Sequence, residues 1–193
     1  MPIQIKKLNN AIKVGFQLPK QKTNGDIGRW VEDKLEKNGY TFNRGMGPDL
    51  PELGGIEVKT RQLSSTSGHT VGAMSVTDIV DTPWKSSNFH KKIQKQYRVY
   101  YDDYNIVKSE AVYDFSDSDI QNLLEESYEA GRTELSMYAD MVVSPKYIRG
   151  ENCIAYFEYQ EASGQYQFRL SNNGMQKIET MAQQTFNNLF EIE

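Results

Sequence analysis

The sequence predicts a mixed α/β fold in which helices and strands alternate along the chain. Amphipathic helical patterns at residues 26–38 and 174–190 enclose runs of alternating or β-branched residues that are typical of strands. Clusters of Gly, Pro, Asn and Asp separate these segments and mark turns. The chain has 193 residues, of which 38% are hydrophobic and 25% charged, so it is long enough to bury a core as one domain over 1–193.

The first predicted helix covers residues 26–38. Thr23–Asp26 has the pattern of a helix-capping box, and Gly39 is suited to ending the helix. Its apolar face carries Ile27, Trp30, Val31 and Leu35. Residues 43–55 are rich in glycine and proline, and we expect them to form the loop that follows.

Strands are expected next, at about 56–61, 70–76 and 96–115, with the last run folding back at a turn at Asp103–Tyr104. A helix is expected between them, from Ser86 to about Gln96. In the later part of the chain the patterns predict a helix capped by Ser116–Asp117, a β-hairpin over 153–159 and 165–170, and the helix at 174–190.

The composition excludes several classes of protein. No apolar run approaches 18 residues and no charged-then-apolar leader is present, so we expect neither a membrane span nor a secretion signal. A single cysteine, Cys153, excludes an internal disulfide framework and a cysteine-based zinc site. We therefore expect an intracellular protein, cytoplasmic and associated with the nucleoid.

Charge is distributed unevenly, although the net charge is only −4. Residues 1–23 carry lysines and no acid, and residues 110–129 carry acids and no base. Between them, residues 59–98 are strongly basic, with Lys59, Arg61, Lys85, Lys91, Lys92, Lys95 and Arg98 against Asp78 and Asp81. Local basic surface of this kind suits a phosphate backbone, and it also occurs on ordinary solvated helix faces.

The stretch Pro48–Thr60 carries the pattern D-x(n)-E-x-K through Asp49, Glu57 and Lys59. Alternate side chains of a strand share a face, so Glu57 and Lys59 should point the same way, with Asp49 leaning in from the preceding turn. Two carboxylates can hold a hard cation such as Mg²⁺, and a neighbouring lysine can orient a water. This pattern is typical of metal-dependent nucleases, although short matches also arise by chance in charged proteins.

Three blocks of sequence resemble the MutH family of the PD-(D/E)xK nuclease superfamily, which includes mismatch-repair nicking endonucleases and related type II restriction endonucleases. The blocks are Gly28–Leu35, Pro48–Thr60 and Trp84–Ile93, and a weaker match is Ser144–Lys146. The chain departs from the family by one extra residue before the E-x-K glutamate, supplied by the Gly54–Gly55 pair. A glycine pair in a loop can absorb such an insertion as a bulge.

The resemblance implies a restriction-endonuclease-like core: a mixed β-sheet flanked by helices, with a catalytic core over about 24–115 and a DNA-reading lobe over about 116–193. It also implies roles for individual residues. Asp49 and Glu57, with the main-chain carbonyl of Val58, would ligate Mg²⁺, and Lys59 would orient the attacking water. Glu32 would be an accessory carboxylate, able to serve a second metal, and Lys92 would contact the scissile phosphate. The alternative is that both are ordinary surface charges.

Double-stranded DNA is the partner that this reading implies. Lys91, Lys95, Lys146 and Arg61 are candidate DNA-binding residues. The two histidines, His69 and His90, lie in no recognisable metal or hydrolase constellation, although His90 shares the predicted helix with Lys92. A homodimer would read a palindromic site, whereas a monomer would nick DNA or cut the strands in succession.

The function that the resemblance implies is therefore a Mg²⁺-dependent, sequence-specific DNA endonuclease of the type II restriction class. One alternative is a mismatch-repair strand nickase recruited by repair partner proteins. Another is a DNA-binding module that kept the fold and lost catalysis, and a third is a structural protein with a chance motif. The retained Asp49, Glu57, Lys59 and Lys92 argue against a relic.

Overall fold

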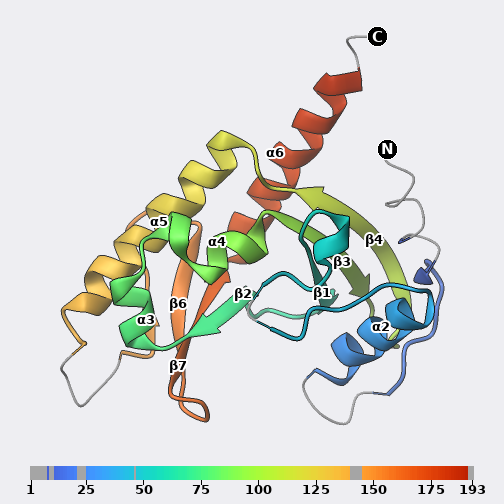
Figure 1. The fold of residues 1–193 in the computed structure, drawn as a ribbon, viewed down its shortest axis with the longest axis horizontal. Helices are drawn as coiled ribbons and strands as arrows, with labels where there is room; N and C mark the ends of the chain where they lie inside the picture. The colour runs from blue at the N-terminus through green and yellow to red at the C-terminus, as the bar shows by residue number, and fades with distance from the viewer. Residues whose placement is uncertain (1–7, 9–10, 21–24, 46, 140–144, 191–193) are drawn as a thin grey trace. The chain divides into compact units, whose positions relative to one another are not determined.

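A three-stranded mixed sheet and a four-stranded antiparallel sheet, packed against helices, form the mixed α/β fold in the computed structural model (Figure 1). The structure describes residues 8, 11–20, 25–45, 47–139 and 145–190. The chain divides into two compact units, which we describe separately. The first comprises Met1–Thr66 and Gln94–Asp114, and the second comprises Ser67–Ile93 and Phe115–Glu193.

The sheet of the first unit has the order β1-β3-β4, with β1 at Ile56–Gln62, β3 at Lys95–Tyr101 and β4 at Val107–Asp114. β1 runs parallel to β3, and β3 runs antiparallel to β4. The strands expected at 56–61 and 96–115 are therefore confirmed. The expected turn is present too, because the Asp102 carboxylate accepts hydrogen bonds from the backbone N–H groups of Tyr104 and Ile106, at 3.0 and 2.8 Å.

Helix α2, Asp26–Lys37, packs against β1 and covers one face of this sheet (Figure 1). The helical spacing of its apolar residues predicts this, and Ile27, Val31 and Leu35 are buried in one core with Ile56, Val58, Tyr97 and Val99. Gly25 precedes the helix with φ 103°, whereas Thr23 and Asn24 of the expected capping box lie outside the described residues.

The sheet of the second unit has the order β2-β7-β6-β5 and is antiparallel throughout. Its strands are β2 (His69–Met74), β5 (Tyr147–Ile148), β6 (Ala155–Gln160) and β7 (Gln165–Leu170). The predicted hairpin is thus confirmed as β6 and β7. The prediction that the strand near 70–76 joins the sheet of 56–61 and 96–115 is wrong, because β2 pairs with β7.

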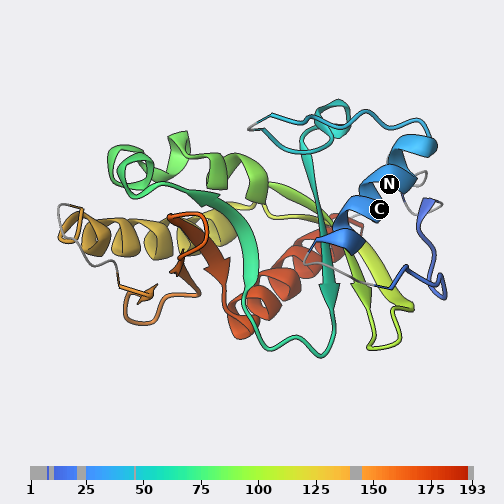
Figure 2. The ribbon, with the colours of Figure 1, turned by 90° about the horizontal axis from the view of Figure 1, so that it is seen from below.

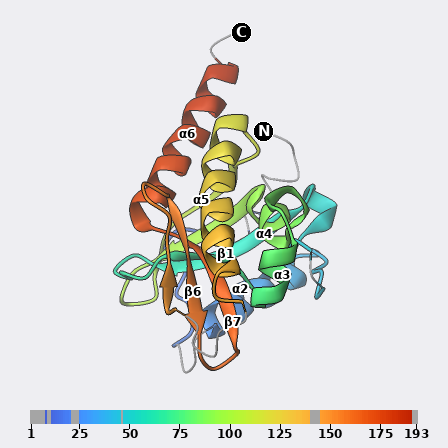
Figure 3. The ribbon, with the colours of Figure 1, turned by 90° about the vertical axis from the view of Figure 1, so that its left-hand side faces the viewer.

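Helices pack on one another and on this antiparallel sheet around an aromatic core. They are α3 (Val76–Asp81), the 3-10 helix η2 (Trp84–Ser86), α4 (Asn88–Ile93), α5 (Ser118–Ser136) and α6 (Asn172–Phe190). Figure 3 shows α5 beside the β6–β7 hairpin, where Tyr128 meets Phe157 and Phe168 with ring centroids 5.6 and 5.7 Å apart. Asp117 caps α5 as predicted, accepting hydrogen bonds from Asp119 and Ile120. The helix expected over 86–96 is shorter, because Lys95 and Gln96 belong to β3.

No helix in the described part of the chain is long and apolar enough to cross a membrane.

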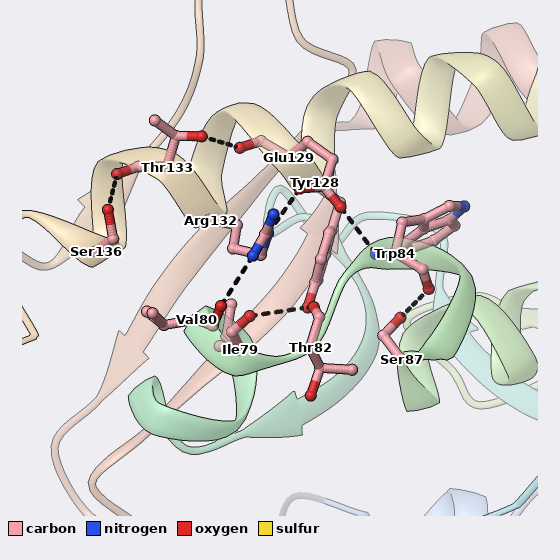
Figure 4. Close-up of polar contacts among 10 residues, drawn as sticks. All are labelled: Ile79, Val80, Thr82, Trp84, Ser87, Tyr128, Glu129, Arg132, Thr133 and Ser136. Atoms are coloured by element: carbon pink, nitrogen blue, oxygen red, sulfur yellow. Dashed lines mark hydrogen bonds and ion pairs between the residues drawn. The ribbon is translucent and has the colours of Figure 1, made fainter.

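A polar brace ties the segment of α3 and η2 to α5 (Figure 4). The Glu129 carboxylate accepts hydrogen bonds from the backbone N–H of Trp84 at 2.8 Å and from Nε of Arg132 at 2.6 Å. Arg132 also donates to the carbonyl of Val80 at 2.9 Å, and the Tyr128 hydroxyl donates to the carbonyl of Thr82 at 2.8 Å. The brace provides hydrogen-bond partners for backbone groups in the segment that connects α3 to η2. In a connecting segment, such groups otherwise bind water.

Replacing Glu129 by alanine should therefore lower the free energy of unfolding by about 1–3 kcal/mol, since it removes an acceptor shared by two donors. Urea unfolding followed by circular dichroism measures this change. Glu126 is an exposed carboxylate on the same helix, and Glu126→Ala should change stability by less than about 0.5 kcal/mol. Equal effects of the two variants would show that the brace contributes nothing.

Candidate active site

A tight loop that includes Asp49 leads into β1, and Figure 2 shows this loop at the start of the strand. Leu50 and Ile56 form an antiparallel bridge, in which the N–H of Leu50 donates to the carbonyl of Ile56 at 2.8 Å and the reverse bond measures 3.2 Å. The 3-10 helix η1, Pro51–Leu53, and two glycines complete the loop. Gly54 and Gly55 have φ of 78° and 84°, a conformation that residues with a side chain rarely adopt.

The Asp49 carboxylate lies at the edge of β1. Its Oδ2 atom accepts a hydrogen bond from the backbone N–H of Val58 at 2.8 Å. In an extended strand the N–H and C=O of one residue point to the same edge, so the Val58 carbonyl also points to the edge where Asp49 lies. The backbone of Asp49 is held as well, because its carbonyl accepts from the N–H of Asn43 at 2.8 Å.

Glu57 and Lys59 lie on the same face of β1, as the alternation of a strand predicts. Lys59 Nζ is 2.7 Å from Glu57 Oε1. The Glu57 side chain is only 2% exposed, whereas that of Lys59 is 25% exposed. The lysine thus compensates a buried carboxylate while keeping part of its own surface open, which is an arrangement suited to a site rather than to a solvated surface pair.

Two residues of β3 that the sequence analysis did not single out lie beside this pair. The parallel register places Gln96 next to Glu57 and Arg98 next to Lys59. Gln96 is 1% exposed and Arg98 is 3% exposed, and the Arg98 guanidinium lies 5.7 Å from the centroid of the Tyr100 ring. In the sequence, these two residues are marked only by the polar–apolar alternation of β3. The pairing between the strands decides which side chains lie next to each other.

The donor atoms around Asp49 fit a hard divalent cation. Two carboxylates and a main-chain carbonyl are oxygen ligands of the kind that Mg²⁺ takes. Among the residues that the structure describes, no three or more His, Cys, Asp and Glu side chains are grouped so as to hold a metal. The Val58 carbonyl and water would complete the coordination of an ion held by Asp49 and Glu57.

Glu32, the predicted accessory carboxylate, lies on α2 and binds Arg44. Arg44 Nη1 is 2.7 Å from Glu32 Oε2, and Arg44 Nη2 is 2.7 Å from Glu36 Oε1. These two ion pairs connect the loop after α2 to the helix. A role of Glu32 at a second metal stays a prediction.

Lys91 and Lys92 lie in the second unit, on α4. Lys91 is exposed, whereas Lys92 is half-buried with its stem beside Gly72 of β2. The neighbouring His90 is partly buried, which lowers its pKa. Lys146, also in this unit, is exposed, with Nζ 5.5 Å from the centroid of the Tyr147 ring; Ser144 of the same weak match lies outside the described residues.

Lys95 and Arg61 lie in the first unit, at opposite ends of the parallel strand pair. Lys95 begins β3 and places Nζ 3.6 Å from Asp114 Oδ2. Arg61 is near the end of β1 and donates from Nη2 to the carbonyl of Ser65 at 2.8 Å. Contacts of these two residues with DNA stay predictions.

No protein-family model matches this chain, and no curated protein matches it. The family resemblance carried by the sequence blocks therefore stays a prediction, and the functional argument depends on the geometry of the residues themselves.

The loop geometry leads to a stability prediction. Gly55→Ala should lower the free energy of unfolding by about 1–2 kcal/mol, because alanine is strained at positive φ. Its Cβ would also lie 3.3 Å from Pro48 Cγ. The measurement is urea unfolding.

Gly28→Ala is the matched control, since Gly28 lies inside α2 and a Cβ there would make only an ordinary contact, 3.6 Å from Thr60 Oγ1. That variant should be neutral or stabilising by up to about 1 kcal/mol, as alanine favours helices. A Gly55→Ala protein as stable as the wild type would contradict the strained loop.

Proposed function

We propose that this protein is a Mg²⁺-dependent DNA endonuclease of the type II restriction class, with a restriction-endonuclease-like core. One observation carries the proposal: the Asp49 carboxylate accepts a hydrogen bond from the N–H of Val58. Val58 is the residue between Glu57 and Lys59, which form an ion pair. Asp49 is thereby held beside the stretch of β1 that carries Glu57, the Val58 carbonyl and Lys59. The resemblance to the MutH family supports the same reading.

Each residue has a defined task in this proposal. Asp49, Glu57 and the Val58 carbonyl would hold Mg²⁺, which when bound supplies Lewis-acid stabilisation of charge on a phosphodiester. Lys59 would orient the attacking water, and its ion pair with Glu57 fixes the position of the ammonium group. The loop holds Asp49 in place before the ion arrives, which reduces the reorganisation that the reaction requires.

Charge on the same sheet face supports binding of phosphate. Lys59 and Arg61 of β1 and Arg98 of β3 alternate onto the face that carries Glu57, so three cations accompany one carboxylate on these two strands. Such an excess of positive charge favours an anionic ligand.

A role for Lys92 in contacting the scissile phosphate rests on the resemblance to the MutH family alone, through the block Trp84–Ile93.

The test is incubation of the full chain with supercoiled plasmid and Mg²⁺, followed by sequencing of the ends. We expect discrete cuts that EDTA abolishes and that Lys59→Ala reduces about 100-fold or more. Lys37→Ala, which removes an exposed lysine from α2, is the matched control and should cut like the wild type.

The form of the product separates the candidate functions. Cuts in both strands support the restriction class, whereas cuts in one strand support a nickase. Equal cleavage by Lys59→Ala and wild type would contradict the assigned site. Intact plasmid, with and without adenine methylation, would contradict an autonomous endonuclease and favour a DNA-binding module or a nickase that needs partner proteins.

A further inference from the structure

We propose that Gln96 is a positioning residue that holds the Glu57 carboxylate in the orientation needed for a divalent ion. The inference rests on the proposed function, because it assigns Glu57 the role of a metal ligand. It adds a residue of another strand, outside the D-x(n)-E-x-K pattern, to the machinery of the site.

The sheet register is the first argument. Glu57 and Gln96 are directly paired in the parallel ladder of β1 and β3. Neighbouring strands lie about 4.8 Å apart, and paired residues project to the same face of a sheet. The two side chains therefore leave the sheet next to each other.

Burial and chemistry give the second argument. Glu57 and Gln96 are 2% and 1% exposed. An ionised carboxylate only accepts hydrogen bonds, whereas a primary amide offers two N–H donors. Burying both groups is costly unless they are hydrogen-bonded, and the amide of Gln96 supplies the donors that a carboxylate requires.

Gln96 differs in its position from Arg98, the charged residue of β3 on the same face. Arg98 is paired with Lys59 rather than with Glu57. Lys59 binds the Glu57 carboxylate from the same strand, with Nζ 2.7 Å from Oε1. An ammonium group from β1 and an amide from β3 would thus fix the carboxylate from two directions, and such outer partners typically contribute 10–100-fold to metal affinity or activity.

The experiment measures binding of Mn²⁺ to the full chain without DNA, by electron paramagnetic resonance of the free ion. Gln96→Met keeps the length of the side chain and removes its hydrogen bonds, and we expect about 10–100-fold weaker binding. Gln17→Met is the matched control: Gln17 donates to the carbonyl of Tyr104 and pairs with Ile106, in the turn that joins the far end of β3 to β4. It should bind Mn²⁺ within about twofold of the wild type.

A second variant and a second readout separate positioning from folding. Gln96→Asn keeps the amide but withdraws it by one methylene group, so it should also weaken Mn²⁺ binding. It serves as the test variant if Gln96→Met does not fold. In plasmid cleavage, the variants should need more Mg²⁺ for half-maximal rate while the rate at saturating Mg²⁺ changes less. A residue with a structural role alone would not shift the Mg²⁺ dependence.

The outcomes separate the two proposals. If the wild type binds Mn²⁺ and both folded Gln96 variants bind it equally well, the role of Gln96 is overturned and the proposed function stands. If the wild type neither binds Mn²⁺ nor cleaves DNA, the proposed function is overturned and the role of Gln96 with it.

Discussion

The parallel pairing of β1 with β3 is the constraint on which the first unit depends. Its register places Ile56, Val58, Tyr97 and Val99 in the core under α2, and it places Glu57, Lys59, Gln96 and Arg98 together on the other face. Because the side-chain period of a strand is two, a slip of one residue would exchange these faces. The apolar core therefore enforces the arrangement of the polar residues.

This pairing has an electrostatic cost that the fold alone does not explain. Lys59 and Arg98 are neighbours across the two strands, and like charges in that relation are destabilising. Gln96, Glu57 and Arg98 are also almost fully buried, although polar residues of these types are usually exposed. Local rules of stability are most often broken where residues serve a function, and the loop of Gly54 and Gly55 breaks another of them.

Features with a local signal could be predicted from the sequence. The apolar spacing of α2, the Asp117 cap of α5, the turn after Asp102 and the β6–β7 hairpin depend on residues close together in the chain. The shared face of Glu57 and Lys59 follows from strand alternation in the same way. Each of these needs only a few neighbouring residues to specify it.

Features that depend on distant residues could not be predicted. β2 pairs with β7 far along the chain, so its own pattern identifies a strand and not the sheet that it joins. Gln96 and Arg98 become candidates only when the register with β1 is known. Gly131 of α5 looks unfavourable for a helix, but a Cβ there would lie 2.5 Å from the Phe157 ring, so close packing on β6 requires glycine.

The central claim is that Asp49, Glu57 and the Val58 carbonyl form one divalent-ion site. The most direct measurement is X-ray diffraction from crystals of the protein soaked in Mn²⁺, with an anomalous difference map collected near the manganese edge. The account predicts a peak within coordination distance, about 2.0–2.4 Å, of oxygens from both carboxylates. A map with no peak there, or with the ion bound only elsewhere, would contradict it.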